Sequence, residues 1–331
     1  MARRGVSARA SGQSPLQAFV KKTASTNDPL PGGVTVLDGS MAGELERHGV
    51  DMSTRLWSAI ALRCAPDAIE AVHTSYLRAG AAILTTNSYQ ATVPGFASLG
   101  LSEQEASELI ATSATLARRA ICLWRAAHPG PRLWVAGSIG PYGAYLADGS
   151  EYRGDYALSP ADYRDFHRPR IAALARGGVD LFAVETQPKL DEAGAIVELM
   201  AREFPGIWAW VSFSLRDGRT LADGTPLTAA ARWACRQPNL LAVGINCVPP
   251  RIVEQALGVL AAGTDLPLIC YPNSGESYDP STKSWHTGGE HPGIAEFVPS
   301  WRRAGARIIG GCCRTTPHDI AEIAHRLRAE G

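Results

Sequence analysis

Residues 240–247 read LLAVGINC, and this stretch carries the pattern that decides the fold. Its apolar side chains do not alternate with polar ones, so both faces of an extended segment would be buried. Such burial is typical of a parallel strand covered by helices on both sides. The run ends on Asn246 and Cys247. Because parallel α/β proteins build their sites at the carboxyl ends of strands, the stretch predicts a buried strand that presents reactive groups at its end.

The same pattern occurs at seven other places, separated by segments with helical periodicity. In residues 66–79 apolar residues recur at three- and four-residue spacing, and Gly80 supplies a C-terminal stop. After the last run, Thr316 and Pro317 suit the N-cap and first position of a final helix. The seven further candidate strands span residues 34–40, 81–89, 133–140, 181–187, 207–215, 267–275 and 306–313.

Eight strand and helix units in one chain predict an α/β fold, a single-domain (β/α)8 TIM barrel. A doubly wound open sheet is the alternative, but its phosphate-binding fingerprints, G-x-G-x-x-G and G-x-x-x-x-G-K-[ST], do not occur. We expect the barrel domain over residues 15–331, beginning with a short helix at 15–22. Residues 1–14 are expected to form a disordered tail. The basic residues near the N-terminus leave an organelle transit peptide as another interpretation.

The composition argues against several classes of function. The 331 residues contain 32 Lys plus Arg and 32 Asp plus Glu, so charge gives no case for binding nucleic acid or an anionic membrane. No apolar run reaches the roughly 18 residues that span a bilayer. Seven cysteines, an odd number, indicate reduced thiols in a cytoplasmic protein. Metal binding or catalysis is therefore expected rather than a disulfide framework.

Three cysteines lie at the ends of predicted strands, which converge on one mouth in a barrel. Cys247 ends one strand, and Cys312 with Cys313 ends the last. Three thiolates with an open fourth position describe a catalytic zinc site, and thiolates favour Zn²⁺ over Mg²⁺ or Ca²⁺. The alternative is that they are simply small buried residues. That interpretation is adopted for the other four cysteines, Cys64, Cys122, Cys235 and Cys270.

Two adjacent cysteines in a regular strand would point to opposite faces. Gly310 and Gly311 precede them, and glycine allows the backbone to leave the pleat. We therefore expect the regular backbone hydrogen bonding between this strand and its neighbours to stop at or just before Cys312. The sulfur atoms of Cys312 and Cys313 should then both lie within reach of a zinc ion held by Cys247.

Two acids also end otherwise apolar strands, Asp38 and Glu185. They could form an anionic pocket for a ligand ammonium, or a polar cap on the barrel. Gly39 and Ser40 follow directly, and their backbone N–H groups could hold a carboxylate. An amino acid would need both features.

Three aromatic residues near the same mouth, Trp57, Tyr89 and Tyr142, are candidates for binding a cation, since aromatic faces attract positive charge. Ordinary packing is the alternative for each of them.

Long motifs resemble a known family. They are LDGSMAGELERHGVDMSTRLWSA (37–59), TTNSYQATVPGF (85–96), GSIGPYGAYLADGSEYRGDY (137–156), GINC (244–247), YPNSGESYD (271–279) and GARIIGGCCRTTP (305–317). The chain is similar to the zinc-dependent homocysteine S-methyltransferases along nearly its whole length, and most to the bacterial branch that uses S-methylmethionine. The resemblance implies a methyltransferase that makes methionine from homocysteine and a sulfonium donor, S-methylmethionine or S-adenosylmethionine.

The resemblance also implies roles for individual residues. The zinc ligands fall on Cys247, Cys312 and Cys313, the homocysteine-binding acids on Asp38 and Glu185, and the donor-site aromatics on Trp57 and Tyr89. Some relatives fill the fourth zinc position with a side chain when substrate is absent, and Asn273 is the candidate here. Selenohomocysteine or selenocysteine as acceptor, and a non-catalytic zinc-stabilised barrel, remain alternatives. A monomer or weak homo-oligomer is expected.

Overall fold

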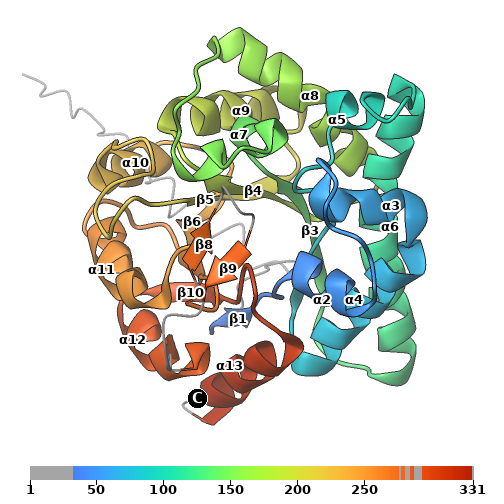
Figure 1. Ribbon diagram of the computed structural model, residues 1–331. Helices are drawn as coiled ribbons and strands as arrows, with labels where there is room; N and C mark the ends of the chain where they lie inside the picture. Colours follow the sequence, from blue (N-terminus) through green and yellow to red (C-terminus); the bar gives the residue numbers. More distant parts are fainter. Residues whose placement is uncertain (1–32, 276, 280–283, 287–292, 330–331) are drawn as a thin grey trace, which may run out of the picture.

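The computed structural model describes residues 33–275, 277–279, 284–286 and 293–329. Eight parallel strands form one sheet in the order β1-β10-β7-β6-β5-β4-β3-β2. A parallel bridge between Leu37 and Ile83 joins the two end strands, so the sheet closes into a barrel seen from one end in Figure 1. The (β/α)8 prediction is confirmed. The strands are β1 (Thr35–Val36), β2 (Ile83–Thr85), β3 (Trp134–Ile139), β4 (Leu181–Gln187), β5 (Trp208–Phe213), β6 (Leu240–Asn246), β7 (Leu268–Tyr271) and β10 (Ala306–Ile309).

Helices surround the barrel (Figure 1). The predicted ends hold: Gly80 terminates α4 at φ 99°, and Thr316 shares reciprocal hydrogen bonds with Asp319 at the start of α13. Among the described residues, no helix combines the length and apolar character needed to cross a membrane. The helices are α2 (Met41–Arg47), η1 (Trp57–Ile60), α3 (Ala61–Cys64), α4 (Pro66–Ala79), α5 (Val93–Ala97), α6 (Glu103–Ala127), α7 (Tyr142–Leu146), η2 (Ser150–Tyr152), α8 (Pro160–Arg176), α9 (Leu190–Glu203), α10 (Leu227–Ala234), α11 (Pro250–Ala261), η3 (Ile294–Phe297), α12 (Val298–Arg303) and α13 (Pro317–Ala329).

Most strands are shorter than the apolar runs predicted. The run at 34–40 yields only β1 plus the bridge at Leu37, and the run at 81–89 yields β2 alone. The cause is visible at Asp38 and Thr85. There the Asp38 carboxylate accepts hydrogen bonds from the Thr85 amide (2.8 Å) and hydroxyl (3.0 Å). Side chains replace backbone partners at the strand ends, which releases the chain from the ladder at the barrel mouth.

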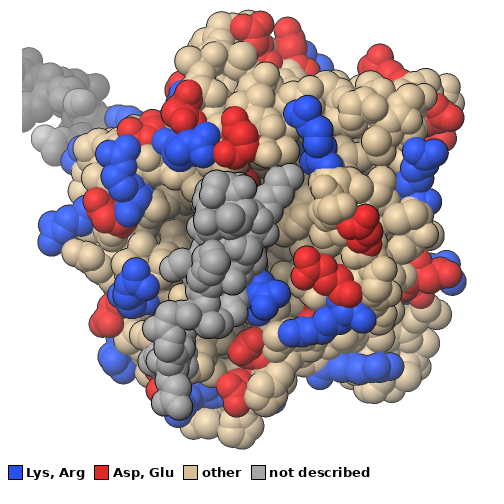
Figure 2. All heavy atoms as spheres, in the orientation of Figure 1, with Lys and Arg blue, Asp and Glu red and all other residues tan. Residues whose placement is uncertain are grey.

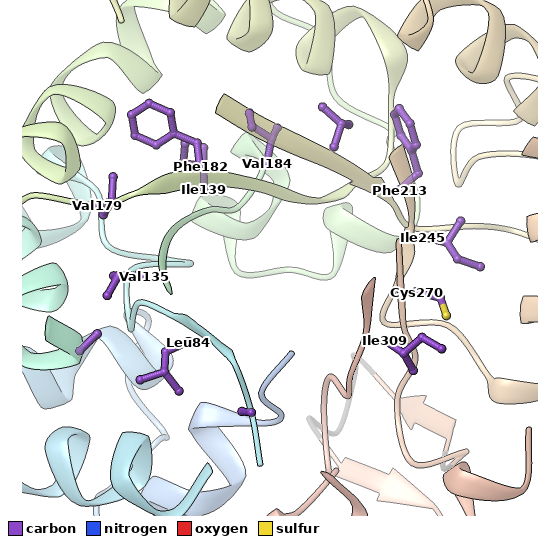
Figure 3. Close-up of a cluster of buried hydrophobic side chains, with 14 of the residues drawn as sticks. Leu84, Val135, Ile139, Val179, Phe182, Val184, Phe213, Ile245, Cys270 and Ile309 are labelled. Carbon is purple, nitrogen blue, oxygen red and sulfur yellow. The ribbon is translucent and has the colours of Figure 1, made fainter. Parts of the chain in front are cut away.

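The side chains of the strands contribute to two separate buried layers, one inside the barrel and one between the barrel and the helices. Ile83, Ala183 and Ile308 belong to a cluster inside the barrel, while Leu84 and Ile309, one residue further on, belong to the layer between barrel and helices. Figure 3 shows this outer layer, whose labelled members also include Val184, Phe213 and Ile245. The period-two alternation of strand side chains explains the division. Both layers are apolar, which is why the runs read as continuously hydrophobic.

The structure partly corrects the interpretation of the other cysteines. Cys270 is buried in the outer layer, as expected (Figure 3). Cys64, Cys122 and Cys235 are exposed instead. Cys64 ends the short helix α3, and Cys122 lies on the long helix α6, whose outer face meets solvent. Exposure on a helix removes the packing reason that was assumed for these three residues.

Two insertions follow strand ends. The one after β3 contains α7 and η2, and the one after β7 contains a two-stranded antiparallel hairpin of β8 (Ser277–Asp279) and β9 (Ser284–His286). On the face in Figure 2, acidic and basic side chains are interspersed, in agreement with the balanced composition. The tail expected at residues 1–14 and the helix expected at 15–22 lie outside the described residues.

Candidate metal centre and amino-acid cavity

A cavity of about 690 Å³ opens at the carboxyl ends of the strands. Its walls come from the segments after β1, β2, β4, β6 and β10, with a contribution from the insertion after β3. Residues distant in sequence therefore share one space, as the barrel prediction required. Of the residues proposed from sequence, those that line the cavity are Asp38, Gly39, Ser40, Trp57, Tyr89, Glu185, Cys247, Cys312 and Cys313.

The three cysteine sulfur atoms form one cluster. Those of Cys247, Cys312 and Cys313 lie within 4.8 Å of one another, and the sulfurs of Cys247 and Cys313 are 3.4 Å apart. Such spacing lets three thiolates coordinate one ion. The donor set is entirely soft sulfur, which suits Zn²⁺ and is unsuited to Mg²⁺ or Ca²⁺. The residues present therefore fit the metal that the resemblance implies.

The regular strand stops before the adjacent cysteines, as expected, although the backbone beyond it still donates hydrogen bonds alternately to the β7 side and the β1 side. β10 ends at Ile309, and the amides of Gly310, Gly311 and Cys312 then donate to Cys270 (3.1 Å), Asp38 (3.0 Å) and Pro272 (2.7 Å) carbonyls in turn. The reason for the glycines differs from the one predicted, because neither has a positive φ. A Cβ on Gly310 would lie 2.7 Å from the Asp38 carbonyl oxygen, and one on Gly311 would lie 2.2 Å from the Thr315 hydroxyl. The close approach of neighbouring segments therefore requires glycine at both positions.

A buried amide supports the third cysteine. Cys247 has φ 51° and Thr186 has φ 55°, conformations that cost non-glycine residues about 1–3 kcal/mol each. Asn246, fully buried between them, accepts from the Thr186 amide and donates to its hydroxyl, both at 2.7 Å. It also accepts from Ser212 (2.8 Å), and its side-chain nitrogen lies 3.8 Å from the sulfur of Cys312. Asn246 thus ties three strand ends to the sulfur cluster.

Sequence reasoning missed two residues of the insertion after β3. The Tyr152 hydroxyl lies 3.3 Å from the sulfur of Cys247, and Glu151 lines the same cavity. The available signal was the length of the insertion after β3, since long loops at this end of a barrel usually serve the site. Asn246 was also missed, although it stands in the GINC motif.

Asp38 and Glu185 are both buried and both line the cavity. The Glu185 carboxylate accepts from the Ser138 hydroxyl. Burial raises its pKa to about 7, against the opposing effect of hydrogen bonds from Ser138 and Tyr271. Burial also raises the pKa of Asp38, and the negative charge of Glu185 adds to that rise. Two neighbouring buried acids with raised pKa values are the kind of group that a positively charged ligand would stabilise in the ionised form.

Gly39 and Ser40, which follow Asp38, both line the cavity. Gly39 packs closely, since a Cβ there would lie 2.9 Å from both the Tyr76 ring and the Thr315 hydroxyl oxygen. The Ser40 hydroxyl accepts from the Gly43 amide (3.1 Å) and begins α2. That these residues hold a carboxylate remains a prediction.

The aromatic candidates divide into two groups. Trp57 and Tyr89 line the cavity, with ring centroids 6.3 Å apart and planes at 75°. Tyr142 is not among the cavity-lining residues, and its ring packs edge-on to Phe166 with centroids 4.9 Å apart. For Tyr142 the packing alternative fits the structure. The helix α7 that carries it turns the ring toward α8 rather than toward the mouth.

Asn273 is also absent from the described residues that line the cavity. Its side-chain oxygen accepts a hydrogen bond from the Gly275 amide at 3.0 Å, and the residue is 6% exposed. That oxygen therefore stabilises the turn after β7. The side chains found within hydrogen-bond distance of the cluster sulfurs include those of Tyr152, at Cys247, and Asn246, at Cys312.

A buried charged network holds the loops after β2 and β3. The Arg170 guanidinium donates to the carbonyls of Tyr89 (2.8 Å) and Gly140 (2.5 Å), and to His167 Nδ1 (2.7 Å). His167 Nε2 lies 2.8 Å from a Glu192 oxygen. Burial lowers the pKa of His167 to about 4, so its neutral ring accepts from Arg170 and donates to Glu192. Through the hydrogen bond from Arg170 to its backbone carbonyl, the network holds Tyr89 in place at the cavity wall.

The comparisons with known proteins agree with this arrangement. The family model described as homocysteine S-methyltransferase matches residues 35–327. A homocysteine S-methyltransferase of Escherichia coli (strain K12) is 48% identical, over 96% of this chain and 99% of that protein. Homocysteine S-methyltransferase 4 of Zea mays is 42% identical, over 95% of this chain and 92% of that protein.

The comparison with solved structures agrees with the sequence matches. The metallated form of the homocysteine methyltransferase MmuM from Escherichia coli has a TM-score of 0.82 and 44% identity, covering 95% of this chain and all of that one. The matching family model and the extent of these similarities lead to one conclusion: the chain belongs to the homocysteine S-methyltransferase family.

Proposed function

We propose that this protein transfers a methyl group from a sulfonium donor, S-methylmethionine or S-adenosylmethionine, to the sulfur of homocysteine, and that Cys247, Cys312 and Cys313 hold a Zn²⁺ ion for the reaction. The single observation that carries the proposal is the convergence of three cysteine sulfurs and two buried acids on one cavity. A free thiol with a pKa near 8.5 is only a few per cent ionised at pH 7. A bound zinc ion would supply the Lewis acidity that keeps the substrate sulfur as thiolate.

The chain's own residues orient the acceptor. Asp38 and Glu185 would bind the ammonium of homocysteine, and the ligand's charge would lower their raised pKa values so that both ionise. The amides of Gly39 and Ser40 would bind its carboxylate. Since an amino acid carries both charges at fixed separation, these contacts would fix the direction of its thiol. A neutral thiol ligand lacking the ammonium should bind weakly.

Trp57 and Tyr89 would receive the donor, since aromatic faces attract sulfonium charge. The substrate sulfur then forms a bond to the methyl carbon while the carbon–sulfur bond of the donor breaks, and the electron pair of that bond stays on the departing thioether. Both reacting charges are neutralised, so no strong general acid is required. The protein's contribution is alignment and exclusion of water. With S-methylmethionine both products are methionine.

The test is an assay of methionine formation from homocysteine with S-methylmethionine, S-adenosylmethionine and betaine in parallel. Turnover with a sulfonium is expected, and its absence with every sulfonium would overturn the donor assignment. Selenohomocysteine and selenocysteine serve as alternative acceptors in the same assay. Metal content should fall in Cys247→Ser and Cys313→Ser. Full zinc retention in both would remove the proposed centre, and a zinc-loaded protein without any turnover would indicate a non-catalytic barrel.

Three further properties belong to the proposal. A cytoplasmic location follows from the need to keep the three thiols reduced. We propose a single barrel domain over residues 15–331 with a tail at 1–14; the family match over 35–327 supports the barrel portion alone. A monomer or weak homo-oligomer is expected, and sedimentation of the zinc-loaded protein at several concentrations tests that expectation.

A further inference from the structure

We propose that the Glu151 carboxylate selects a positively charged methyl donor by attracting its sulfonium group in the cavity. The inference rests on the proposed function and adds a residue to it. Glu151 belongs to η2 in the insertion after β3, and it lines the same cavity as the three cysteines. The next residue, Tyr152, reaches the sulfur of Cys247 at 3.3 Å, which places this part of the insertion beside the metal centre.

The first observation is that Glu151 has an unsatisfied oxygen. Its Oε2 is buried and has no hydrogen-bond partner among the described residues. The neighbouring cation, Arg153, is engaged elsewhere: its guanidinium lies 2.7 Å from Asp155 and 3.7 Å from Asp148, and its side chain is 44% exposed. Glu151 is partly buried, and a carboxylate whose buried oxygen has no partner is costly, because the lost hydration of that oxygen is not replaced. Burial raises the pKa of Glu151 to about 7, and the negative charge of Cys247 adds to the rise.

The second observation is the charge balance of the cavity. The lining includes exposed side chains of both signs, whereas its less exposed charged side chains are all acids: Asp38, Glu185 and Glu151. The exposed charged residues of the lining are Glu46, Asp51, Arg55, Asp148 and Arg314. Homocysteine brings one ammonium, for which Asp38 and Glu185 are proposed. An S-methylmethionine donor carries an ammonium and a sulfonium, so the third acid, Glu151, could attract a cationic group of the donor. Three cysteine thiolates around one divalent ion leave that centre with a net negative charge as well, and this favours a cation over a neutral or anionic donor.

The position of Glu151 distinguishes it from the other two acids. Asp38 follows β1 and Glu185 lies within β4, whereas Glu151 enters from the β3 insertion. Burial raises the pKa of Tyr89, one of the two aromatic residues proposed for the donor, and the negative charge of Glu151 adds to that rise more than the charge of Glu185 does. Glu151 and Tyr89 also line the same cavity, so Glu151 is assigned to the donor.

The proposed role of Glu151 predicts a specific change in the kinetic constants when its carboxylate is removed. Methyl transfer moves the electron pair of the breaking carbon–sulfur bond onto the donor sulfur. The positive charge on that sulfur is therefore smaller in the transition state than in the bound donor. A carboxylate near that sulfur consequently stabilises the bound donor more than the transition state. Removing such an interaction weakens donor binding without lowering the rate of the chemical step. A purely structural role would instead lower kcat or affect both substrates.

The test compares Glu151→Gln with the wild type, both loaded with zinc. We expect the KM for S-methylmethionine to rise about tenfold or more, with kcat unchanged or higher and the KM for homocysteine within about twofold. Asp155→Asn is the matched control: it removes one carboxylate from the same loop, at a side chain that is 53% exposed and outside the cavity lining. Its donor KM should stay within about twofold. If Glu151→Gln does not fold properly, Glu151→Ala provides a second variant, and its KM for S-methylmethionine should rise in the same way.

A direct titration of S-methylmethionine into the zinc-loaded proteins separates this inference from the proposed function. Weaker binding by Glu151→Gln supports the role of Glu151 even if turnover proves to use another donor. Equal donor affinity in wild type and both Glu151 variants, with zinc retained, would overturn it. So would loss of zinc from Glu151→Gln, since the carboxylate would then be acting on the metal. Absence of turnover with every sulfonium in the wild type contradicts the proposed function alone.

Discussion

The side-chain amide of Asn246 and the backbone of Thr186 form a matched pair: Asn246 accepts from the Thr186 amide and donates to the Thr186 hydroxyl, both at 2.7 Å. Thr186 follows Glu185, and Asn246 precedes Cys247, so the pair couples the acid of the cavity to a sulfur of the metal centre. Thr186 and Cys247 both have positive φ. The pair therefore stabilises two unfavourable backbone conformations on either side of the barrel mouth.

Asn246→Ala should destabilise the protein by about 1–3 kcal/mol, because it leaves the buried amide of Thr186 without its acceptor and removes one of the two partners of the Ser212 hydroxyl. Urea unfolding of the metal-free protein measures this change, and metal titration should show weaker zinc binding. Thr186→Val is the matched control, since it removes only the hydroxyl and should cost less. Equal zinc affinity in Asn246→Ala and wild type would mean that Cys247 keeps its position without the network.

Gly311→Ala should disrupt the metal centre. Its Cβ would lie 2.2 Å from the Thr315 hydroxyl oxygen, so the segment carrying Cys312 and Cys313 must shift. We expect a loss of zinc and a lower melting temperature. Gly258→Ala is the control: nothing lies within 4 Å of its Cβ position in helix α11, and replacing a helical glycine by alanine usually stabilises by about 0.5–1 kcal/mol. Normal zinc content in Gly311→Ala would contradict the close-approach argument.

The metal-free protein should lose stability as the pH rises from about 4.5 through 7. The pKa of Glu185 is about 7 in the fold and 4.5 ordinarily, so the folded state holds the proton more tightly than the unfolded chain does. The resulting loss is at most about 3 kcal/mol. Glu185→Gln isolates this effect, because other titrating groups are shared. Urea unfolding at pH 5 and pH 7.5 should show a smaller pH dependence in the variant, and an unchanged one would remove the assignment.

Arg170→Met should cost about 3–5 kcal/mol, because it removes the buried cation linked to Glu192 through His167 and leaves the carbonyls of Tyr89 and Gly140 without these donors. The double variant Arg170→Met with Glu192→Gln should recover part of that loss. Arg168→Ala, on the same helix but 40% exposed, should cost no more than about 1 kcal/mol. If the zinc-loaded Arg170→Met folds, its donor KM should rise, since Tyr89 loses its anchor. A donor KM equal to that of the wild type would contradict the positioning role.

Much of this protein could be predicted from patterns that act over short distances. Runs such as LLAVGINC indicate strands because burial on both faces requires apolar residues at successive positions. The barrel then brings all strand ends to one mouth, so Asp38, Glu185 and the three cysteines could be assigned to a common site without coordinates. Their convergence is a property of the topology, and small shifts in strand ends do not change it.

The tertiary structure alone decided which loop residues belong to the site. Tyr142 and Tyr152 lie in the same insertion, yet only the second reaches the cavity, because the paths of α7 and η2 determine the direction of each ring. Asn273 stabilises a turn, and Glu151 enters beside the sulfurs. Such outcomes depend on contacts between segments far apart in sequence, which no local periodicity records. The sequence by itself determined the barrel and the convergence of its three cysteines, while loop packing decided which side chains complete the cavity.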